Sequence, residues 1–380
     1  MSPTPTLLSS LQWPPQAETL AAALAVAVAA FLLRRAFAGW AATRPFADRI
    51  LVLGAGPLAH SLIAALETPG HAHWGRVVGV VADDGEQPPD SCRLLGRLEE
   101  LEEVVESVRP QRIVVALTTR RGRMPVRSLL ELRVQGIAVD DGHELYERLT
   151  GKLAIEALVP SALIFSPDCR ANRLSRALGR GVSLVAAILG LALTAPLIGL
   201  IALLVVLDSG HPAFFLHERL GLGGRRFNLV KFRTMRRAPC SCSEWERDNL
   251  ERITFVGRWL RKFRLDELPQ FWNVLKGDMN LIGPRPHPVR NLRLFDERIP
   301  YYRLRLAVRP GITGWAQVRY GYANNLEEEI EKMRYDLYYI KHQSTRLDLA
   351  IVFQTVKIML RGQEAAPQAS FAPEPTFGIR

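Results

Sequence analysis

The chain has 380 residues, too many for one ordinary hydrophobic core, so we expect at least two globular units together with membrane elements. Its 49 Lys and Arg against 38 Asp and Glu give a net charge of +11, which favours anionic partners such as acidic lipid, nucleic acid or nucleotide phosphates. Among four cysteines only Cys240 and Cys242 lie close together, in a spacing that fits neither a zinc ribbon nor a redox pair, so reduced cytoplasmic thiols are expected.

Residues 1–44 contain one candidate membrane helix, at about residues 16–37. A helix of this length measures about 33 Å, just enough to span the hydrocarbon of a bilayer. No basic residue precedes it, whereas Arg34, Arg35 and Arg44 follow, so it lacks the charged start of a signal peptide and its C-terminal side is expected in the cytoplasm. A buried helix of a soluble domain is the alternative.

Residues 45–166 alternate between short apolar strands and a helical pattern, which predicts a Rossmann-like α/β domain. Strands are expected at Ile50–Leu53, Val77–Val81 and Ile113–Leu117. The first strand is followed by apolar residues at helical spacing between Leu58 and Leu66. The pattern is therefore that of a βαβ series.

A glycine-rich turn follows the first strand and makes Gly54 and Gly56 weak candidates for cofactor binding. With the alanine three residues later they match G-x-G-x-x-A, which lets a pyrophosphate approach helix amides, and Asp83 or Asp84 would be the acidic partner. The residue directly after Gly56 is proline, which removes one amide from this anion site. Dinucleotide binding therefore stands beside a second interpretation, a domain used for assembly or regulation, and we assign it no cofactor.

A second apolar segment, residues 182–207, has no charged residue and is long enough to cross a bilayer, but Pro196 lies in its middle. Clusters of Arg and Lys flank the segment on both sides, so the positive-inside bias predicts that both ends stay on the cytoplasmic side. We therefore expect a re-entrant helix hairpin that turns at Pro196, with Thr194 available to satisfy freed backbone groups. A kinked helix that crosses the bilayer completely is the alternative.

The junction between the two domains is expected near residue 165, where prolines interrupt the pattern after a short helix at Glu144–Leu149. The C-terminal domain is then expected at 167–362. Residues 363–380 are rich in Pro, Ala and Gln and lack periodicity, which predicts a disordered tail.

Two basic elements precede the most polar part of the C-terminal domain. Residues 227–232 alternate like a strand and would place Lys231 and Arg233 side by side on one face, unless that face is merely solvated. Residues 255–263 combine apolar residues at helical spacing with Arg and Lys, including Arg261, which predicts an interfacial amphipathic helix.

Two adjacent carboxylates, Asp266 and Glu267, follow directly. We expect Asp266 to be the N-cap of a helix over 267–276 that ends at Gly277, so that the helix amides favour an anionic phosphate beside it. Basic neighbours and a divalent ion would offset the repulsion between a carboxylate nucleophile and a phosphate. The alternative is that Asp266 merely caps the helix while Glu267 complements its dipole.

Several ordered motifs carry a resemblance to a known family. Residues 261–286, KFRTM at 231–235, RPGITGWAQV at 309–318 and YDLYYIK at 335–341 closely resemble the bacterial sugar transferases, the monotopic polyprenyl-phosphate phosphoglycosyl transferases. The resemblance covers about residues 172–362. Residues 50–166 look like the Rossmann-like domain of larger members linked to exopolysaccharide production.

The resemblance implies an enzyme that transfers a phosphosugar from a nucleoside diphosphate sugar, usually a UDP-sugar, to polyprenyl (undecaprenyl) phosphate with release of UMP, as the first membrane step of surface glycan synthesis. It implies Asp266 as the nucleophile that forms a phosphosugar intermediate, Glu267 as its acid-base neighbour, and Mg²⁺ with Asp266 as ligand. It further implies substrate-binding roles for Lys231, Arg261 and the turn of Pro284, Arg285 and Pro286. Asp336, expected near the site, and Arg233, expected beside Lys231, are also assigned to substrate binding.

The implied fold is α/β, with a Rossmann-like N-terminal domain and a mostly α membrane-associated catalytic domain that holds a re-entrant hairpin. The implied location is the bacterial inner membrane, with the catalytic domain on the cytoplasmic face. The expected partners are a nucleotide sugar, polyprenyl phosphate, the lipid bilayer and glycan-assembly proteins, with self-association through the N-terminal domain as a further candidate and no nucleic acid.

The chain departs from the family pattern in its membrane elements. Ala195-Pro196 stands where Ser-Pro is typical, Ser183 stands where an Asp often occurs, and only one N-terminal membrane helix is a candidate where larger members usually carry several.

Two other classes of protein are the alternatives. A membrane-anchored NAD(P)-dependent nucleotide-sugar dehydratase would need a Tyr-x-x-x-Lys pair, which the region after residue 117 does not show, and a non-catalytic glycan-assembly scaffold would not need Asp266, Glu267 and Lys231.

Overall fold

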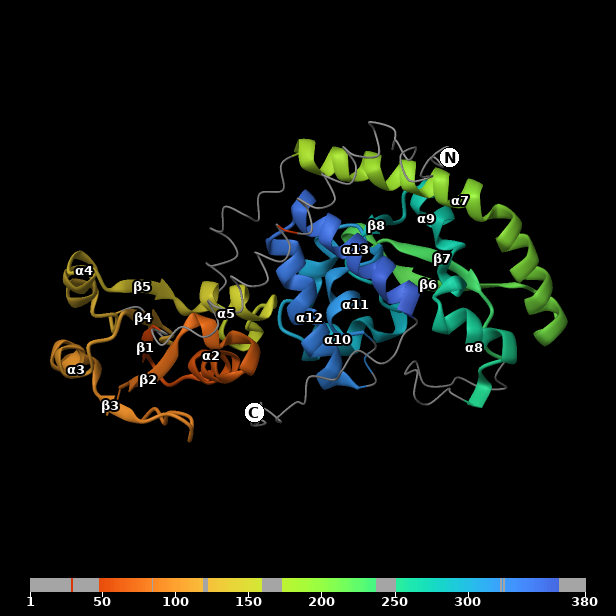
Figure 1. Ribbon diagram of the computed structural model, residues 1–380. Helices are drawn as coiled ribbons and strands as arrows, with labels where there is room; N and C mark the ends of the chain where they lie inside the picture. Colours follow the sequence, from red (N-terminus) through yellow and green to blue (C-terminus); the bar gives the residue numbers. More distant parts are fainter. Residues whose placement is uncertain are drawn as a thin grey trace, which may run out of the picture. The chain divides into compact units, whose positions relative to one another are not determined.

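The computed structural model describes residues 29, 48–83, 85–118, 122–158, 173–236, 251–321, 323 and 325–361 (Figure 1). The chain divides into two compact units, Met1–Leu145 and Tyr146–Arg380, and each is described by itself. The predicted helix at 16–37, apart from residue 29, and the predicted tail at 363–380 lie outside the described residues, as does the predicted domain boundary near residue 165.

A parallel sheet forms the centre of the N-terminal unit. Within the described residues its five strands lie in the order β3-β2-β1-β4-β5. Their bounds are β1 Arg49–Leu53, β2 Arg76–Val81, β3 Leu94–Gly96, β4 Arg112–Val115 and β5 Ala138–Asp141. The predicted α/β pattern is confirmed, because strands buried on both faces read as continuous apolar runs. β3 and β5 were not predicted, since β3 has only three residues and β5 is short and ends in two aspartates.

Helices connect these strands and cover the sheet. They are α2 (Pro57–Glu67), η1 (Pro69–Trp74), η2 (Leu98–Glu100), α3 (Leu101–Val108) and α4 (Val126–Val134). Leu51, Leu53 and Ile113 of the central strands pack against Leu101 and Leu129 of the helices in one buried cluster. Burial of these side chains supplies the main stabilisation of the unit.

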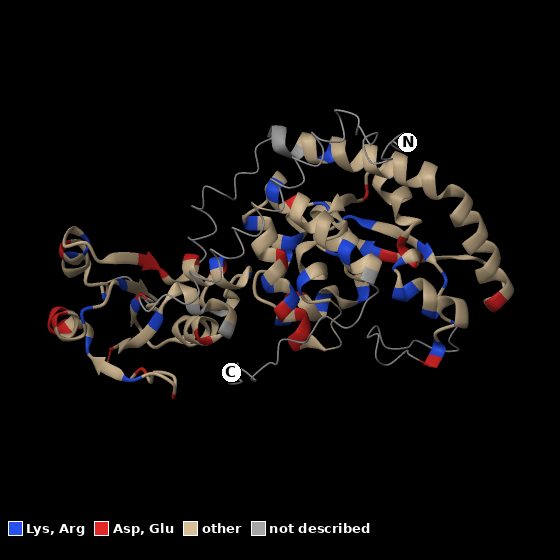
Figure 2. Ribbon diagram, in the orientation of Figure 1, with Lys and Arg blue, Asp and Glu red and all other residues tan. Residues whose placement is uncertain are grey.

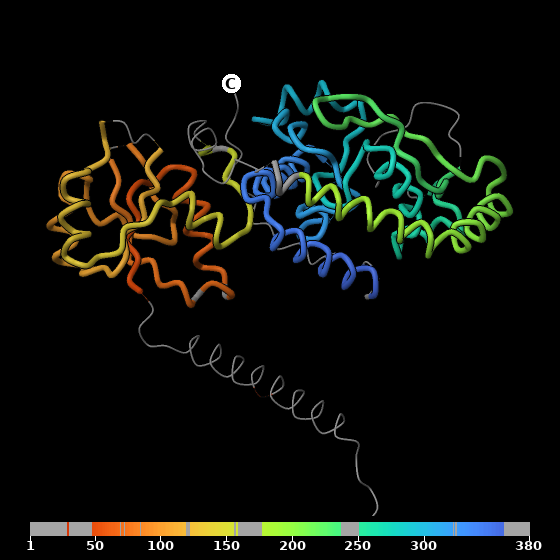
Figure 3. The backbone as a smooth tube through the Cα atoms, turned by 90° about the horizontal axis from the view of Figure 1, so that it is seen from above, coloured from red at the N-terminus to blue at the C-terminus, as the bar shows by residue number. Residues whose placement is uncertain are grey.

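A long apolar helix, α7 (Arg173–Ser209), opens the described part of the C-terminal domain. It includes Pro196 without interruption, and its axis bends in both Figure 1 and Figure 3 rather than folding back on itself. The helix therefore bends without a reversal at Pro196, and the predicted re-entrant hairpin is not confirmed. Pro196 lacks one helix donor, while the Thr194 hydroxyl donates to the carbonyl of Gly190 at 2.6 Å.

Two short sheets and two short helices pack beneath α7. β6 (Phe214–Leu220) pairs antiparallel with β7 (Arg226–Phe232) around the turn η5 (Leu222–Gly224), and β8 (Asn280–Ile282) pairs parallel with β9 (Gly311–Thr313). The predicted strand at 227–232 and helix at 255–263 are confirmed as β7 and α8 (Phe255–Lys262). Next come η7 (Leu265–Glu267) and α9 (Gln270–Lys276), and α9 packs against both α7 and β7.

Gly190 is a point of close approach between α7 and α9. A Cβ at this position would lie 2.9 Å from ring atoms of Phe271, so only glycine allows the helix to pass the ring without displacing it. The contact is continued by Arg180, whose guanidinium donates to the carbonyls of Val274 and Met279, both at 2.7 Å. The N-terminal part of α7 is thereby fixed to the end of α9.

The remaining helices complete the C-terminal unit. They are η8 (Val289–Asn291), α10 (Leu292–Arg298), η9 (Tyr302–Ala307), α11 (Trp315–Arg319), α12 (Leu326–Lys341) and α13 (Thr345–Arg361). Phe295, Ile299, Tyr302, Met333 and Leu337 form their shared core. The predicted mostly helical C-terminal part is confirmed.

Residues 146–158, which we call the strap, belong to this same core. They include the end of α5 (Gly142–Thr150), which confirms the short helix predicted at Glu144–Leu149, and η3 (Ile155–Ala157). Leu153, Ile155 and Leu158 are buried in the core cluster. Lys152 pairs with Glu331 of α12 at 2.7 Å. The strap is therefore part of the C-terminal unit although it precedes α7 in the chain.

Candidate active site

The two central carboxylates lie in a tight turn between α8 and α9. Arg264 has left-handed backbone (φ 54°), a conformation that is unfavourable for a residue with a side chain and is often found at functional sites, and η7 follows it at once. The predicted helix start is wrong, because the chain makes this 3₁₀ turn first and Pro269, not Asp266, is the N-cap of α9. The predicted stop at Gly277 is confirmed by its positive φ of 97°.

Cationic side chains from three elements surround Asp266. Lys231 comes from β7, Arg261 from the last turn of α8 and Arg285 from the turn after β8, and all three act electrostatically on the Asp266 carboxyl. Figure 2 shows Lys and Arg gathered on the strands and helices below α7, whereas α7 itself is almost free of charge. The structure therefore brings together the predicted nucleophile and most of its predicted cationic partners.

The environment pushes the pKa values of the two carboxylates apart. Burial and then the neighbouring Glu267 carboxylate raise the pKa of Asp266 to about 6, against the effect of the three cations. Burial also acts to raise the pKa of Glu267, but Arg285 and Arg264 outweigh it and hold that pKa below its ordinary value. Arg285 Nη2 donates to Glu267 Oε1 at 2.7 Å. Near pH 7 both groups are ionised, with Asp266 the more basic of the two.

Lys231 is the cation most sensitive to this environment. Burial and then Arg219 lower its pKa to about 8, while Asp266 acts in the opposite direction. Its Nζ lies 5.6 Å from the centre of the Phe215 ring, which is compatible with a cation–π contact. A half-buried lysine with few competing solvent contacts suits recognition of a phosphate oxygen.

Asn273 of α9 ties this helix to β7, the strand that carries Lys231. This side chain of α9 is 1% exposed, its Oδ1 accepts from Val230 N at 3.0 Å, and its Nδ2 donates to Asn228 O at 2.8 Å. A buried amide satisfied on both sides ties the helix to the strand. Sequence reasoning missed this residue, although a polar side chain on the apolar face of a short helix was a usable signal.

Two predicted substrate residues have other contacts. The Arg233 guanidinium is buried and donates to the carbonyls of Ser209 at 2.9 Å and His211 at 3.0 Å, after the end of α7. Asp336 of α12 is 2% exposed and accepts from Arg305 Nη2 at 2.7 Å. Their substrate roles stay predictions, and Asp336 is connected to the site through Arg305, which sequence reasoning did not single out.

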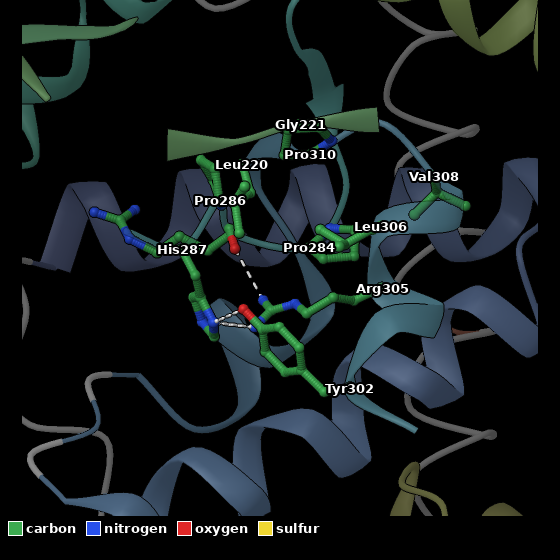
Figure 4. Close-up of a pocket in the computed structure, with 11 residues that line it drawn as sticks. Leu220, Gly221, Pro284, Pro286, His287, Tyr302, Arg305, Leu306, Val308 and Pro310 are labelled. Atoms are coloured by element: carbon green, nitrogen blue, oxygen red, sulfur yellow. Dashed lines mark hydrogen bonds between the residues drawn. The ribbon is translucent and has the colours of Figure 1, made fainter. Parts of the chain in front are cut away.

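A pocket lies beside the Pro284–Arg285–Pro286 turn, and Asp266 is not part of its lining. Figure 4 shows its lining, in which Leu220, Leu306, Val308 and Pro310 supply apolar walls. Arg285, whose side chain reaches Glu267, is shared between this pocket and the carboxylate pair.

In the N-terminal unit, the glycine turn is already occupied by the chain itself. The amide of Ala55 donates to Glu86 Oε2 at 2.9 Å, so a carboxylate of the protein stands where a phosphate oxygen would bind. A Cβ on Gly56 would lie 2.0 Å from Thr118 Oγ1, so packing against this side chain by itself favours glycine here. Of the two candidate acidic partners Asp83 pairs with Arg123 at 3.3 Å, and Asp84 lies outside the described residues.

Large apolar side chains remain exposed on the helices next to the site. Within the described residues, Ala177–Ser209 is the one helix that is long and apolar enough to cross a membrane. Trp259 of α8 is 54% exposed, Trp272 of α9 58% and Phe353 of α13 72%. Such a surface, rimmed by Arg and Lys, is typical of a membrane contact.

Comparison with known proteins decides the family. The profile of the family described as "Bacterial sugar transferase" matches residues 174–362. A "UDP-glucose:undecaprenyl-phosphate glucose-1-phosphate transferase" from Caulobacter vibrioides is 43% identical over 190 residues, which cover 49% of this chain and 71% of that protein. The chain belongs to the bacterial sugar transferase family.

Two further relatives of this bacterial sugar transferase extend the comparison. A "UDP-N-acetylgalactosamine-undecaprenyl-phosphate N-acetylgalactosaminephosphotransferase" from Aeromonas hydrophila is 42% identical over 227 residues, 58% of this chain and 51% of that protein. An "Undecaprenyl-phosphate glucose phosphotransferase" from Komagataeibacter xylinus is 31% identical over 325 residues, 83% of this chain and 59% of that protein. The chain thus spans little more than half the length of these two relatives. The matched family region holds Asp266 and its cationic partners but begins after the strap.

Proposed function

We propose that this protein transfers a sugar phosphate from a UDP-sugar to undecaprenyl phosphate and releases UMP. The observation that carries the proposal is Asp266, a half-buried carboxyl with a pKa raised to about 6 and three cations around it. The named activities of the relatives support the same reaction class, and because their sugars differ the proposal stops at UDP-sugars. The reaction would be the first membrane step in the synthesis of an exopolysaccharide or other surface glycan.

The reaction proceeds in two displacements at one phosphorus. A carboxylate oxygen of Asp266 forms a bond to the phosphorus that bears the sugar, while the bond from that phosphorus to the UMP oxygen breaks and UMP leaves with the electron pair. A phosphate oxygen of undecaprenyl phosphate then bonds to the same phosphorus, and the bond to Asp266 breaks. The carboxylate is regenerated, and the product is undecaprenyl-diphosphate-sugar.

The surrounding side chains make these steps feasible. Lys231, Arg261 and Arg285 offset the repulsion between an anionic nucleophile and an anionic diphosphate. Glu267 has a lowered pKa and stays ionised, so in the free enzyme it keeps Arg285 in place and raises the basicity of Asp266. A more basic carboxylate is the better nucleophile once it has lost its proton.

Mg²⁺ fits this site as a substrate-bound ion. Within the described residues no group of three or more His, Cys, Asp and Glu is arranged to hold a metal, and Mg²⁺ is usually bound through one or two carboxylates together with substrate phosphates. Asp266, whose pKa is raised by burial and by the carboxylate beside it, gains most from a nearby cation. When bound, the ion would neutralise charge on the diphosphate.

The membrane arrangement is part of the proposal. We place the protein at the bacterial inner membrane with the site on the cytoplasmic face, and α7 in one leaflet with both ends returning to the cytoplasm, supported by the basic flanks and the bend of α7. Accessibility tags near residues 170 and 220 test this arrangement. Both should react from the cytoplasmic side, and tags that react from opposite sides would establish a complete span.

Membranes containing wild type or Asp266→Asn test the reaction. With wild type, UMP is released from a UDP-sugar, and without undecaprenyl phosphate the labelled sugar phosphate stays bound to the protein. Asp266→Asn should lower UMP release at least about a thousand-fold and abolish labelling. Asp296→Asn, which removes a partly exposed carboxylate paired with the exposed Arg303, should behave as wild type. Equal release by Asp266→Asn and wild type would refute the mechanism.

A further inference from the structure

A cluster of buried charged side chains lies behind the Pro284–Arg285–Pro286 turn, and the mechanism above does not use it. The side chain of Arg305 in η9 is 3% exposed, and that of its partner Asp336 in α12 is 2% exposed. Glu329 lies in the same cluster and is 6% exposed. Removing charges from water costs more than their mutual attraction usually returns, so the cluster is poor evidence for a purely stabilising role.

Each carbonyl of the turn accepts a hydrogen bond from a donor elsewhere in the unit. The carbonyls of Pro284, Arg285 and Pro286 accept, in that order, from Gly311 N at 3.0 Å, Arg305 Nη2 at 2.8 Å and Arg219 Nη1 at 3.2 Å. Because proline has no N–H, a turn with two prolines is fixed mainly through its carbonyls. Arg305 holds the middle carbonyl, that of the residue whose side chain enters the site.

Arg285 is thereby held at both ends. Its backbone carbonyl is bound by Arg305, and its own guanidinium donates to Glu267 at 2.7 Å. The same Arg305 nitrogen also donates to Asp336 Oδ2 at 2.7 Å. A charge-assisted bond to a buried carboxylate fixes the planar guanidinium, so its position does not depend on solvent.

The neighbouring histidine adds packing without a competing charge. Figure 4 shows His287, Tyr302 and Arg305 pointing toward one another at the base of the pocket. His287 Nδ1 lies 3.0 Å from the Tyr302 hydroxyl and 2.5 Å from Arg305 Nη1, and His287 Nε2 lies 2.6 Å from Glu329 Oε1. Burial, then Arg305, lower the pKa of His287 to about 3, so the ring is neutral beside the guanidinium.

We propose that Arg305, anchored by Asp336, is a positioning residue that fixes the Arg285 backbone so that the Arg285 side chain is correctly placed in the active site. It touches neither Asp266 nor Glu267 and acts through Arg285. The inference rests on the proposed function, since it concerns the same site. Asp336 then acts on the substrate only indirectly, through Arg305 and Arg285, whereas direct substrate binding was predicted for it.

A double-mutant cycle on the full-length protein in membranes tests this. Arg305→Lys keeps the charge beside Asp336 but removes the planar group that reaches the Arg285 carbonyl, and should lower kcat at least tenfold with a smaller change in KM for the UDP-sugar. Arg303→Lys is the matched control, because Arg303 is 76% exposed and pairs with Asp296 on the surface. It should leave both constants unchanged.

The cycle separates positioning from folding. In an Arg285→Ala background, Arg305→Lys should reduce kcat by less than threefold, because its target is gone. The inference is overturned if the losses of kcat multiply in the double variant, or if Arg305→Lys keeps the wild-type kcat. Neither result would affect the proposed function, which depends on UMP release by wild type and its loss in Asp266→Asn. No UMP release by wild type overturns both proposals.

A milder variant covers the case in which Arg305→Lys does not fold, as judged by its thermal melt. Asp336→Asn keeps an oxygen acceptor for Arg305 and loses only the charge. It should lower kcat several-fold, and this loss should disappear in the Arg285→Ala background. An Asp336→Asn loss that persists undiminished in that background assigns Asp336 a role independent of Arg285 and overturns the inference.

Discussion

The glycine turn of the N-terminal unit and the carboxylate pair of the C-terminal unit both match phosphate-site patterns, but their surroundings differ. At the glycine turn the Ala55 amide donates to Glu86, and Gly56 has no Cβ because Thr118 lies against it. Around Asp266, burial and a second carboxylate raise the pKa to about 6 while three cations face it. A motif whose polar groups are satisfied by the chain indicates structure, whereas one that leaves a carboxyl with a perturbed pKa indicates chemistry.

Replacing the glutamate in each unit gives the largest expected contrast. Glu267→Gln removes an anion that holds Arg285 in place. The same anion raises the basicity of Asp266, so its loss should lower kcat by about 10² to 10³. Glu86→Gln should change kcat less than twofold. The measurement is UMP release at saturating UDP-sugar. A similar loss in both variants would place the N-terminal turn in the catalytic machinery.

The pH dependence of kcat/KM should report the C-terminal site alone. Because the pKa of Asp266 is raised to about 6, activity should fall below that pH as the nucleophile gains a proton. Because the pKa of Lys231 is lowered to about 8, activity should fall above that pH as the cation is lost. Lys231→Arg should stay charged and move the alkaline limb upward.

The control for this profile is the variant Glu86→Gln, which should keep both limbs where wild type has them. If Lys231→Arg retains an alkaline limb near pH 8, that limb belongs to another group. The alkaline limb of the pH profile would then no longer report the charge on Lys231, and it could not be used to distinguish the C-terminal site from the N-terminal turn.

The strands and the site residues differed in how well the sequence predicted them. Ile50–Leu53 and residues 227–232 are local patterns, and both strands are confirmed. Asp266 was predicted together with its neighbours Lys231 and Arg261, because family motifs carry them, and these cations do act on its carboxyl. Arg305 and Asn273 were missed, because their roles depend on carbonyls of distant residues that no local pattern reports.

The bend of α7 is a second feature that the sequence predicted only in part. Pro196 correctly marked where the helix loses a hydrogen bond, but loss of one bond does not set the direction of the chain afterwards. Packing sets it, for example where Gly190 lets α7 approach Phe271. The N-cap predicted at Asp266 failed for a related reason, since the left-handed Arg264 has no signature in the sequence.

Gly56→Ala tests why the N-terminal turn contains glycine. The added methyl would overlap Thr118 Oγ1, so the free energy of unfolding of the N-terminal unit should fall by about 1 to 3 kcal/mol. Thr118→Ala removes the overlapping oxygen and should recover most of the loss in the double variant. Denaturant melts measure both. A glycine kept for pyrophosphate binding would instead leave stability unchanged.

Glu86→Ala gives the smallest expected effect and decides the remaining ambiguity of the N-terminal turn. Loss of a single hydrogen bond from a partly exposed carboxylate to the Ala55 amide should cost about 1 kcal/mol or less of stability. Calorimetric titration with NAD or a UDP-sugar, with and without Glu86→Ala, distinguishes a structural glutamate from one that occupies a nucleotide site. Both proteins carry Asp266→Asn so that the C-terminal site does not turn over. If Glu86 completes the turn as a structural element, removing it should create no affinity, because the proline after Gly56 still denies the site one amide. If Glu86 instead occupies a nucleotide site, Glu86→Ala should bind the nucleotide more tightly than the protein with Glu86. Both units would then hold a phosphate site, one closed by Glu86 and the other open.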